Sequence, residues 1–251
     1  KIINFPLQKI GGIKISGLSL DSRNVRSGNL FFALKGSRLN GNNYIKEAIK
    51  NGAKIIVSST DISLKNSKIK FIKANNIRKT LAFACKQFYK NKPKNIIAVT
   101  GTNGKSSVAD FFYQILLLNK KKVASIGTLG IKNNKNIKKI NLTSPDIIFL
   151  HKELSALKKK KIDNVIIEAS SHGLKQGRLD GINFKIGIFT NFSQDHLDYH
   201  KSMKNYFNAK LILFSNLMKK NNYMITDKDN KKYKDLKIVA LKNKLKLRTI
   251  E

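Results

Sequence analysis

The sequence predicts an α/β protein in two parts, a small domain at residues 1–92 and a larger domain at residues 93–251. From Ile96 onward, short runs of β-branched residues alternate with longer helical patterns. This alternation is typical of a mostly parallel sheet that is covered by helices on both faces. A glycine-rich segment joins the first of these runs to the helix after it. The segment Asn91–Lys94 places a proline after a helical pattern, and we expect it to be the linker.

Each element of this fold is expected from a local pattern. In the first domain the sequence predicts β-rich segments within residues 27–34 and 53–57, a helix that Gly52 ends, a strand at residues 69–72 and a helix at residues 80–90. In the second domain the strands are predicted at residues 96–99, 123–126, 165–167, 186–189 and 224–226. The main helices are predicted at residues 107–119, 147–160 and 203–217. We expect Cys85 to be buried in its helix and His151 to lie at the surface.

The composition limits the classes of partner. A net charge of +35 favours an anionic partner such as nucleic acid, but the excess is almost all scattered lysine rather than arginine. The lysine runs at residues 120–122 and 158–161 are predicted to be solvated helix ends. No apolar run reaches the roughly 20 residues that span a bilayer. The start has no initiating Met and no signal-peptide pattern, and a single cysteine fits a reducing cytoplasm. We therefore predict neither a nucleic-acid partner nor membrane insertion.

The segment Val99-Thr-Gly-Thr-Asn-Gly-Lys-Ser106 is predicted to bind phosphate. A strand leads into it, Gly101 and Gly104 allow the backbone amides to turn inward, and a helix follows it. Lys105 can then reach the outer phosphates, and the Ser106 hydroxyl can bind Mg²⁺. An ordinary strand-turn-helix connection rich in glycine is the alternative.

Two further polar segments, residues 168–172 and 191–200, follow predicted strands, at the edge where parallel sheets carry their sites. Glu168 is a candidate metal ligand, or alternatively a cap of the next turn. His196 and His200 could bind zinc if a third ligand joined them, although an oxygen-rich site favours magnesium. His172 beside a serine could be a catalytic base, but no hydrolase elbow surrounds it. Arg178 is suited to grip a carboxylate.

These motifs resemble a known family. The phosphate loop, Ile167-Glu-Ala-Ser-Ser-His-Gly-Leu-Lys-Gln-Gly-Arg178, Thr190-Asn-Phe-Ser-Gln-Asp-His-Leu-Asp-Tyr-His200 and Tyr206-Phe-Asn-Ala-Lys210 resemble the central-domain signatures of the Mur ligases. Leu20-Asp-Ser-Arg23 and residues 28–36 resemble the amino-terminal domain of the same family. The resemblance implies a UDP-substrate domain followed by an ATP-binding central domain that is incomplete here, without the family's carboxyl-terminal domain.

The activity implied by the resemblance is that of an ATP-dependent carbon–nitrogen ligase of peptidoglycan and cell wall synthesis. Such an enzyme adds a third residue, diaminopimelate or lysine, to UDP-N-acetylmuramoyl-L-alanyl-D-glutamate through an acyl phosphate. The resemblance also implies ATP and Mg²⁺ as cofactors, a cytoplasmic location and a monomer. The UDP-muramoyl dipeptide and an amino acid are the expected partners.

The resemblance carries roles over to individual residues. The expected catalytic residues are Lys105, Lys210 and His196. The expected ATP-binding residues are Gly101, Thr102, Asn103, Gly104, Lys105, Ser106 and Ser107. The expected magnesium ligands are Ser106, Glu168, His196 and Lys210, the last as a carbamate. The expected substrate-binding residues are Leu20, Ser22, Ser37, Arg38 and Leu39 at the uridine end, and Thr143, Ser144, Ser170, Gln176 and Arg178 at the muramoyl-peptide end. A Lys210 side chain that extends to solvent is the alternative to the carbamate.

The chain departs from the family pattern at three places. Asn40-Gly-Asn42 stands where Asp-Gly-His is usual, Ser106-Ser107 stands where threonines are common, and Thr226 stands where an asparagine contacts the adenine. Two other functions remain as alternatives, a folylpolyglutamate synthase of the same superfamily and a basic P-loop protein that binds nucleic acid.

Overall fold

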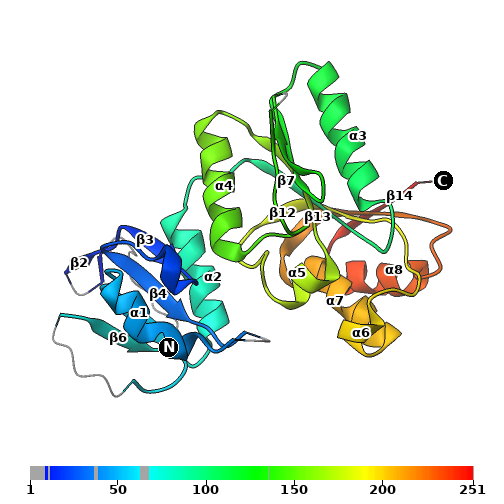
Figure 1. Ribbon diagram of the computed structural model, residues 1–251. Coiled ribbons are helices and arrows are strands. Elements are labelled where there is room, and N and C mark those ends of the chain that lie inside the picture. Colours follow the sequence, from blue (N-terminus) through cyan, green and yellow to red (C-terminus); the bar gives the residue numbers. More distant parts are fainter. Residues whose placement is uncertain (1–8, 11, 37–38, 63–67, 135, 251) are drawn as a thin grey trace. The chain divides into compact units, whose positions relative to one another are not determined.

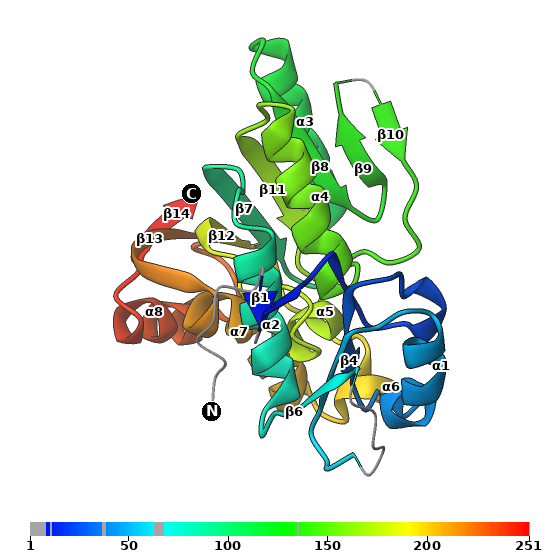
Figure 2. The same ribbon diagram turned by 90° about the vertical axis from the view of Figure 1, so that its left-hand side faces the viewer.

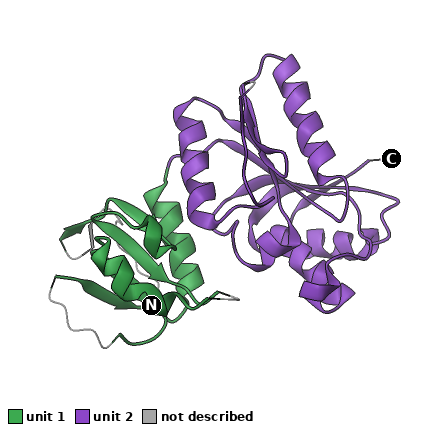
Figure 3. Ribbon diagram, viewed as in Figure 1, with its two compact units in different colours: residues 1–90 green, residues 91–251 purple. Residues whose placement is uncertain are grey.

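The computed structural model of the chain describes residues 9–10, 12–36, 39–62, 68–134 and 136–250. It divides into two compact units, residues 1–90 and 91–251, which Figure 3 colours separately. Each unit has its own sheet and its own core, so each is described by itself.

In the first unit, a parallel sheet has the order β3-β4-β5-β6 among the described strands. Every residue of β4 is buried, which explains the apolar run that follows its first residue, Asn29. The elements are β1 (Lys9–Ile10), β2 (Ile13–Lys14), β3 (Gly17–Ser19), the 3₁₀ helix η1 (Ser22–Asn24), β4 (Asn29–Ala33), the 3₁₀ helix η2 (Gly41–Tyr44), α1 (Ile45–Lys50), β5 (Ile55–Ser58), β6 (Lys70–Lys73) and α2 (Ile77–Phe88).

Helix α2 begins earlier than the sequence pattern indicated. Its first residue is Ile77, because the side chain of Asn76 accepts a hydrogen bond from the Lys79 amide and caps the helix. Cys85 is fully buried in this helix, as predicted.

The second unit alternates strands and helices, as expected. Its elements are β7 (Asn95–Thr100), α3 (Lys105–Leu118), β8 (Val123–Gly127), β9 (Gly130–Asn133), β10 (Asn136–Lys138), α4 (Ile147–Lys159), β11 (Asn164–Glu168), α5 (Ser171–Lys175), β12 (Phe184–Phe189), α6 (Leu197–His200), α7 (Met203–Asn216), β13 (Met218–Asp227), α8 (Tyr233–Lys242) and β14 (Lys246–Ile250).

Among the described strands of this unit, the sheet order is β10-β9-β8-β11-β7-β12-β13-β14. The neighbours from β8 to β14 pair in parallel, which confirms the prediction of a mostly parallel sheet. The edge strands β9 and β10 are antiparallel and were not predicted. The carboxyl ends of β7, β11 and β12 therefore meet at one edge, where the polar motifs begin.

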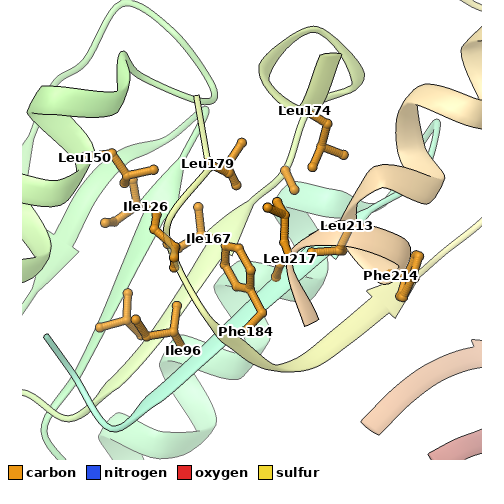
Figure 4. Close-up of a cluster of buried hydrophobic side chains, with 14 of the residues drawn as sticks. Ile96, Ile126, Leu150, Ile167, Leu174, Leu179, Phe184, Leu213, Phe214 and Leu217 are labelled. Atoms are coloured by element: carbon orange, nitrogen blue, oxygen red, sulfur yellow. The ribbon is translucent and has the colours of Figure 1, made fainter. Parts of the chain in front are cut away.

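Helices cover both faces of this sheet, with α3 on one side and α4 on the other (Figures 1 and 2). Alternate residues of β7 divide between two cores, because successive strand side chains point to opposite faces. Ile97 and Val99 pack with Ala109 of α3. Ile96 and Ala98 belong to the larger core, which Figure 4 shows with Leu150 of α4 and Leu213 of α7.

The structure corrects one prediction on α4. His151 was expected at the surface but is fully buried, with its Nε2 2.9 Å from the carbonyl oxygen of Asp180. Its helix is covered by the loop that carries Asp180, a tertiary contact that the lysine-rich sequence around it did not reveal. No helix among the described residues is long and apolar enough to cross a membrane.

Candidate active site

The predicted phosphate loop connects β7 to the first residue of α3. Gly101 and Gly104 adopt positive φ angles of 149° and 81°, which side chains other than glycine rarely tolerate. A Cβ on Gly101 would also collide with the hydroxyl of Thr190. The two glycines therefore allow the tight turn that the sequence predicted.

Residues that follow β12 brace this loop. The Asn103 amide donates to Asn191 Oδ1 at 2.8 Å, and Asn191 Nδ2 donates back to the Asn103 carbonyl at 3.2 Å. Thr190 Oγ1 donates to the same carbonyl at 2.6 Å. The Thr102 amide donates to the backbone carbonyl of Asn191 at 3.0 Å. Two neighbouring strands thus fix the loop in one conformation.

Lys105 lies at the first position of α3 and turns back over the loop. Its Nζ donates to the carbonyl oxygens of Gly101 and Thr102, at 3.1 Å and 2.7 Å. Burial lowers the pKa of Lys105 below its ordinary value, while Glu168 and Asp195 act against that shift. The ammonium group is therefore held above the loop.

Glu168 ends β11 and is 2% exposed. Its Oε2 accepts a hydrogen bond from Ser106 Oγ at 2.8 Å, and its Oε1 accepts one from the Thr128 amide at 2.8 Å. Ser170, and not Glu168, caps the next helix, because Ser170 Oγ accepts from the Gly173 amide. The capping alternative for Glu168 is therefore wrong. Among the described residues this carboxylate makes no ion pair, which suits a cation ligand.

Lys210 of α7 is 1% exposed, so the alternative of a side chain that extends to solvent is wrong. Its Nζ donates to the Gly101 carbonyl at 2.6 Å and lies 4.2 Å from the ring centroid of Tyr206. Burial, with a smaller contribution from the charge of Lys105, lowers the pKa of Lys210 to about 7. Near neutral pH a large fraction of this amine is unprotonated.

His196 precedes α6 and has a left-handed backbone conformation, with φ 51°. Its ring lies near those of His172 and Tyr206, with centroids 4.8 Å and 6.0 Å away. The zinc alternative needs a third ligand beside His196 and His200. Across the part of the chain that the structure describes, no group of three or more His, Cys, Asp or Glu side chains is arranged to hold a metal ion.

Most of these residues surround one cavity of about 300 Å³. It brings together the phosphate loop, the ends of β8 and β11, and helix α7. The lining residues are Thr102, Asn103, Gly104, Lys105, Ser106, Ser107, Thr128, Thr143, Glu168, Ser170, Ser171, His196, Tyr206 and Lys210. Gly101 does not line the cavity, but its carbonyl oxygen accepts hydrogen bonds from Lys105 and Lys210.

Four of the five residues expected at the muramoyl-peptide end form a connected cluster, namely Ser144, Ser170, Gln176 and Arg178, whereas Thr143 bonds the hydroxyl of Thr128. Ser144 Oγ donates to the Glu168 carbonyl at 2.9 Å and accepts from the Ser170 amide. Arg178 Nη1 donates to the Ser144 carbonyl at 2.8 Å, and its Nη2 donates to Gln176 Oε1 at 2.6 Å. Thr143 and Ser170 line the cavity, whereas Ser144, Gln176 and Arg178 do not.

The residues expected at the uridine end lie in the first unit. Leu20, Ser22 and Leu39 line a separate, more apolar cavity of about 380 Å³. Ser22 Oγ donates to Glu47 Oε2 at 2.6 Å. Ser37 and Arg38 fall outside the described residues, so their expected role is not tested.

Two side chains at positions that depart from the family pattern, Asn42 and Thr226, form hydrogen bonds within the chain. The Asn42 side chain accepts a hydrogen bond from Ser58 Oγ and donates one to Thr60 Oγ1, and it does not line the cavity of the first unit. Thr226 is buried, and its hydroxyl donates to the Phe189 carbonyl at 3.0 Å.

Three residues that line the cavity beside the phosphate loop were not predicted from the sequence, namely Thr128, Ser171 and Tyr206. Thr128 follows β8, so the same argument that selected the ends of the other strands applied to it. Tyr206 lies one helical turn before Lys210, a spacing that places two side chains on one face. Ser171 lies within the polar segment at residues 168–172, so its place after a predicted strand was a signal as well.

The chain is similar to known proteins in both sequence and structure. Residues 99–251 match the family described as Mur ligase middle domain, and residues 14–95 match the Mur ligase family, catalytic domain. A Bradyrhizobium diazoefficiens UDP-N-acetylmuramoyl-L-alanyl-D-glutamate–2,6-diaminopimelate ligase is 43% identical over 209 residues, which are 83% of this chain and 43% of that protein. The ligase of the same name from Rickettsia bellii is 41% identical over 92% of this chain and 48% of its own length.

A solved structure under the same ligase name superposes with a TM-score of 0.82 and 30% identity, over 97% of this chain and 51% of the other. The chain therefore spans about half the length of the relatives that it matches.

Proposed function

The chain belongs to the Mur ligase family, and from that premise we propose that it is part of an ATP-dependent amide ligase of peptidoglycan synthesis. The proposed reaction joins an amino acid to UDP-N-acetylmuramoyl-L-alanyl-D-glutamate in the cytoplasm. One observation carries the proposal, namely the cavity that brings Lys105, Glu168 and Lys210 together beside a braced phosphate loop. The relatives that are 43% and 41% identical to the chain bear the name of this ligase.

Amide formation requires charged groups in the site but no nucleophile from the protein. A carboxylate does not react with an amine, so the proposed substrate carboxylate first attacks the terminal phosphorus of ATP. This attack forms an acyl phosphate and releases ADP. The amine then attacks the acyl carbon, and inorganic phosphate leaves. The protein must therefore hold phosphates and offset negative charge more than it must supply a nucleophile.

In this proposal the loop amides of residues 101–107 bind the nucleotide phosphates, and Lys105 places its positive charge over them. Lys105 would exchange its contacts with the loop carbonyls for phosphate oxygens, which are stronger acceptors. Thr143, Ser144, Ser170, Gln176 and Arg178 are proposed to hold the muramoyl-peptide end of the substrate. Leu20, Ser22 and Leu39 are proposed to hold its uridine end.

The donor set fits a magnesium ion. Glu168 is a buried carboxylate whose contacts come from hydroxyl and amide groups, and Ser106 already bonds it. A buried carboxylate without a countercharge is costly, and a divalent cation would offset that cost. We propose that Ser106, Glu168 and His196 hold the ion, which when bound would offset charge on the transferred phosphoryl group.

Lys210 is proposed to become a carbamate and to act as a further oxygen ligand. The amine nitrogen attacks the carbon of CO₂, a new N–C bond forms, and the proton on nitrogen leaves to solvent. The buried amine with its lowered pKa supports this proposal, because only the unprotonated form reacts. The product would be an anion, which suits magnesium better than an ammonium group does.

Binding measurements on the 251-residue chain test the proposal. Calorimetric titration should show binding of ATP in the presence of Mg²⁺ and of the UDP-muramoyl dipeptide. In Glu168→Gln, ATP affinity should no longer depend on Mg²⁺, while the control Glu153→Gln should behave as the parent does. Glu153 lies on α4, forms an ion pair with Lys138 of β10 and does not line the cavity.

The rival nucleic-acid function predicts a different result. If the chain bound duplex DNA above about 0.2 M salt and failed to bind the muramoyl dipeptide, the ligase proposal would be wrong, because salt weakens binding that rests on scattered positive charge alone.

A further inference from the structure

A buried histidine contacts the wall of the cavity that faces the phosphate loop. His200, the last residue of α6, is fully buried, and its Nε2 lies 3.0 Å from the hydroxyl of Ser171. Ser171 is the first residue of α5 and lines the cavity. The other ring nitrogen, Nδ1, is buried and has no hydrogen-bond partner among the described residues.

The unpartnered nitrogen determines where the proton of His200 lies. A neutral imidazole carries one N–H donor and one acceptor. A buried N–H without an acceptor is rarer in proteins than an acceptor without a donor. The proton therefore belongs on Nε2, and His200 donates it to the Ser171 oxygen. Burial supports the neutral form, since it lowers the pKa of His200 to about 4.

This direction leaves the Ser171 proton available. A hydroxyl whose oxygen accepts from His200 must direct its own hydrogen elsewhere, and no acceptor for it is found within the described ranges. The hydroxyl of the neighbouring Ser170 already has partners, because it accepts a hydrogen bond from the Gly173 amide and forms another with the Ser144 hydroxyl. The remaining environment of Ser171 is the cavity, where Lys105 provides positive charge.

We propose that Ser171 donates a hydrogen bond to an anionic oxygen of a ligand in this cavity, and that His200 is the positioning residue that aims it. The inference rests on the proposed function for the identity of the ligand. The anionic oxygen belongs either to a nucleotide phosphate or to the carboxylate of the muramoyl dipeptide. Both groups are strong acceptors for a serine hydroxyl.

Titrations of the 251-residue chain with ADP in the presence of Mg²⁺, and with the UDP-muramoyl dipeptide, test the contact. Ser171→Ala should weaken the binding of one ligand by about ten-fold or more, the loss typical of a hydrogen bond to a charged group. A loss confined to ADP identifies a phosphate oxygen, and a loss confined to the dipeptide identifies the carboxylate. Equal affinities of Ser171→Ala and the parent for both ligands would overturn the proposal.

Variants of the histidine test the positioning role. His200→Phe should match the loss in Ser171→Ala, and the double variant should lose no more than either single variant, because both remove the same contact. His200→Gln should keep most of the affinity, since its side-chain amide can donate from a position close to that of Nε2. His151→Phe is the control for loss of a buried histidine, as His151 does not line the cavity. Additive losses, or an equal loss in the His151 control, would assign His200 a general role in stability.

A measurement without ligand completes the test. Long-range ¹H–¹⁵N NMR spectra of the labelled chain, with His200 assigned through His200→Gln, should show a protonated Nε2 and an unprotonated Nδ1. The opposite tautomer would overturn the proposal whatever the ligand. A parent chain that bound neither ligand would contradict the proposed function itself, whereas normal parent binding with an unaffected Ser171→Ala contradicts only this inference.

Discussion

Two lysines share one carbonyl oxygen at the centre of the site. Lys105 and Lys210 both donate to Gly101, at 3.1 Å and 2.6 Å. The nearby charge of Lys105 adds to burial in lowering the pKa of Lys210. The two side chains therefore differ in the chemistry open to them. Lys105 approaches from the helix start and can move to a phosphate, whereas Lys210 is enclosed and partly neutral.

Replacement of Lys105 tests the first of these roles. We expect Lys105→Ala to weaken ATP binding by about ten-fold or more, because a charged contact to phosphate is lost. The melting temperature should change little, since the contacts of Lys105 in the structure are to two loop carbonyls. Calorimetry and thermal melts of the 251-residue chain provide both values. Lys120→Ala, at the exposed carboxyl end of α3, is the control and should leave both unchanged.

The modification of Lys210 is open to direct detection. In ¹³CO₂-saturated buffer, the ¹³C NMR spectrum of the parent should contain a carbamate signal that Lys210→Met lacks and that Lys120→Met retains. With a pKa of about 7, the neutral amine becomes more abundant as pH rises, so the signal should grow between about pH 6 and pH 8. Identical spectra of the parent and Lys210→Met would rule out the carbamate.

At the scale of elements, the site depends on strands that lie side by side but are far apart in the sequence. Strand β7 pairs with β11 on one side and with β12 on the other. The loop after β7 is braced by residues after β12, and its Ser106 is joined to the carboxylate that ends β11. The parallel order of three strands thus fixes the relative positions of the loop and the acid.

The brace can be removed without disturbing the core. Asn191→Ala deletes the two hydrogen bonds that the side chain exchanges with the Asn103 backbone. We expect about a ten-fold loss of nucleotide affinity, because the loop then samples conformations that do not bind, and only a small change in melting temperature. Titration with ADP in the presence of Mg²⁺ measures this loss.

Asn119→Ala is the matched control, as it deletes a side-chain bond to the Ile115 carbonyl at the other end of α3. If both variants bound nucleotide as the parent does, the bracing role would be wrong.

The sequence predicted the parts of the site that depend on local order. The phosphate loop, Glu168 at a strand end and Lys210 on an apolar helix could be found from spacing and family resemblance, and the cavity contains all three. The bond between His200 and Ser171 could not be found, because it joins helices that are separated by a strand. His151 was misplaced for a similar reason, since a distant loop covers it. The antiparallel edge formed by β9 and β10 was missed because β10 is exposed and polar, while β9 has only four residues, two of them buried, which is too short for a clear strand pattern.

At the scale of the whole molecule, each unit contains one of the two cavities to which substrate roles are proposed. The larger unit contains the polar cavity with the phosphate loop, and the smaller unit contains the more apolar one. The strong positive charge is spread over exposed lysines, such as those that follow α3 and α4. This distribution agrees with the prediction that these lysine runs are solvated helix ends.

The 251 residues are expected to bind substrates without joining them. The chain spans about half the length of its relatives, and we predict that the residues that hold the incoming amino acid lie in the half that it does not span. Mass spectrometry of a reaction with ATP, Mg²⁺, the UDP-muramoyl dipeptide and diaminopimelate or lysine should detect no tripeptide product. Product that forms with the parent and disappears with Lys105→Ala would show this prediction to be wrong.

The bracing of the phosphate loop has a consequence for the speed of nucleotide capture. A loop that is already held by Thr190 and Asn191 does not have to order itself when its ligand arrives. The entropy of loop closure is then lost during folding rather than during each encounter. Association should therefore approach the rate at which nucleotide diffuses to the cavity, and differences in affinity between nucleotides should arise mainly from how fast each one leaves.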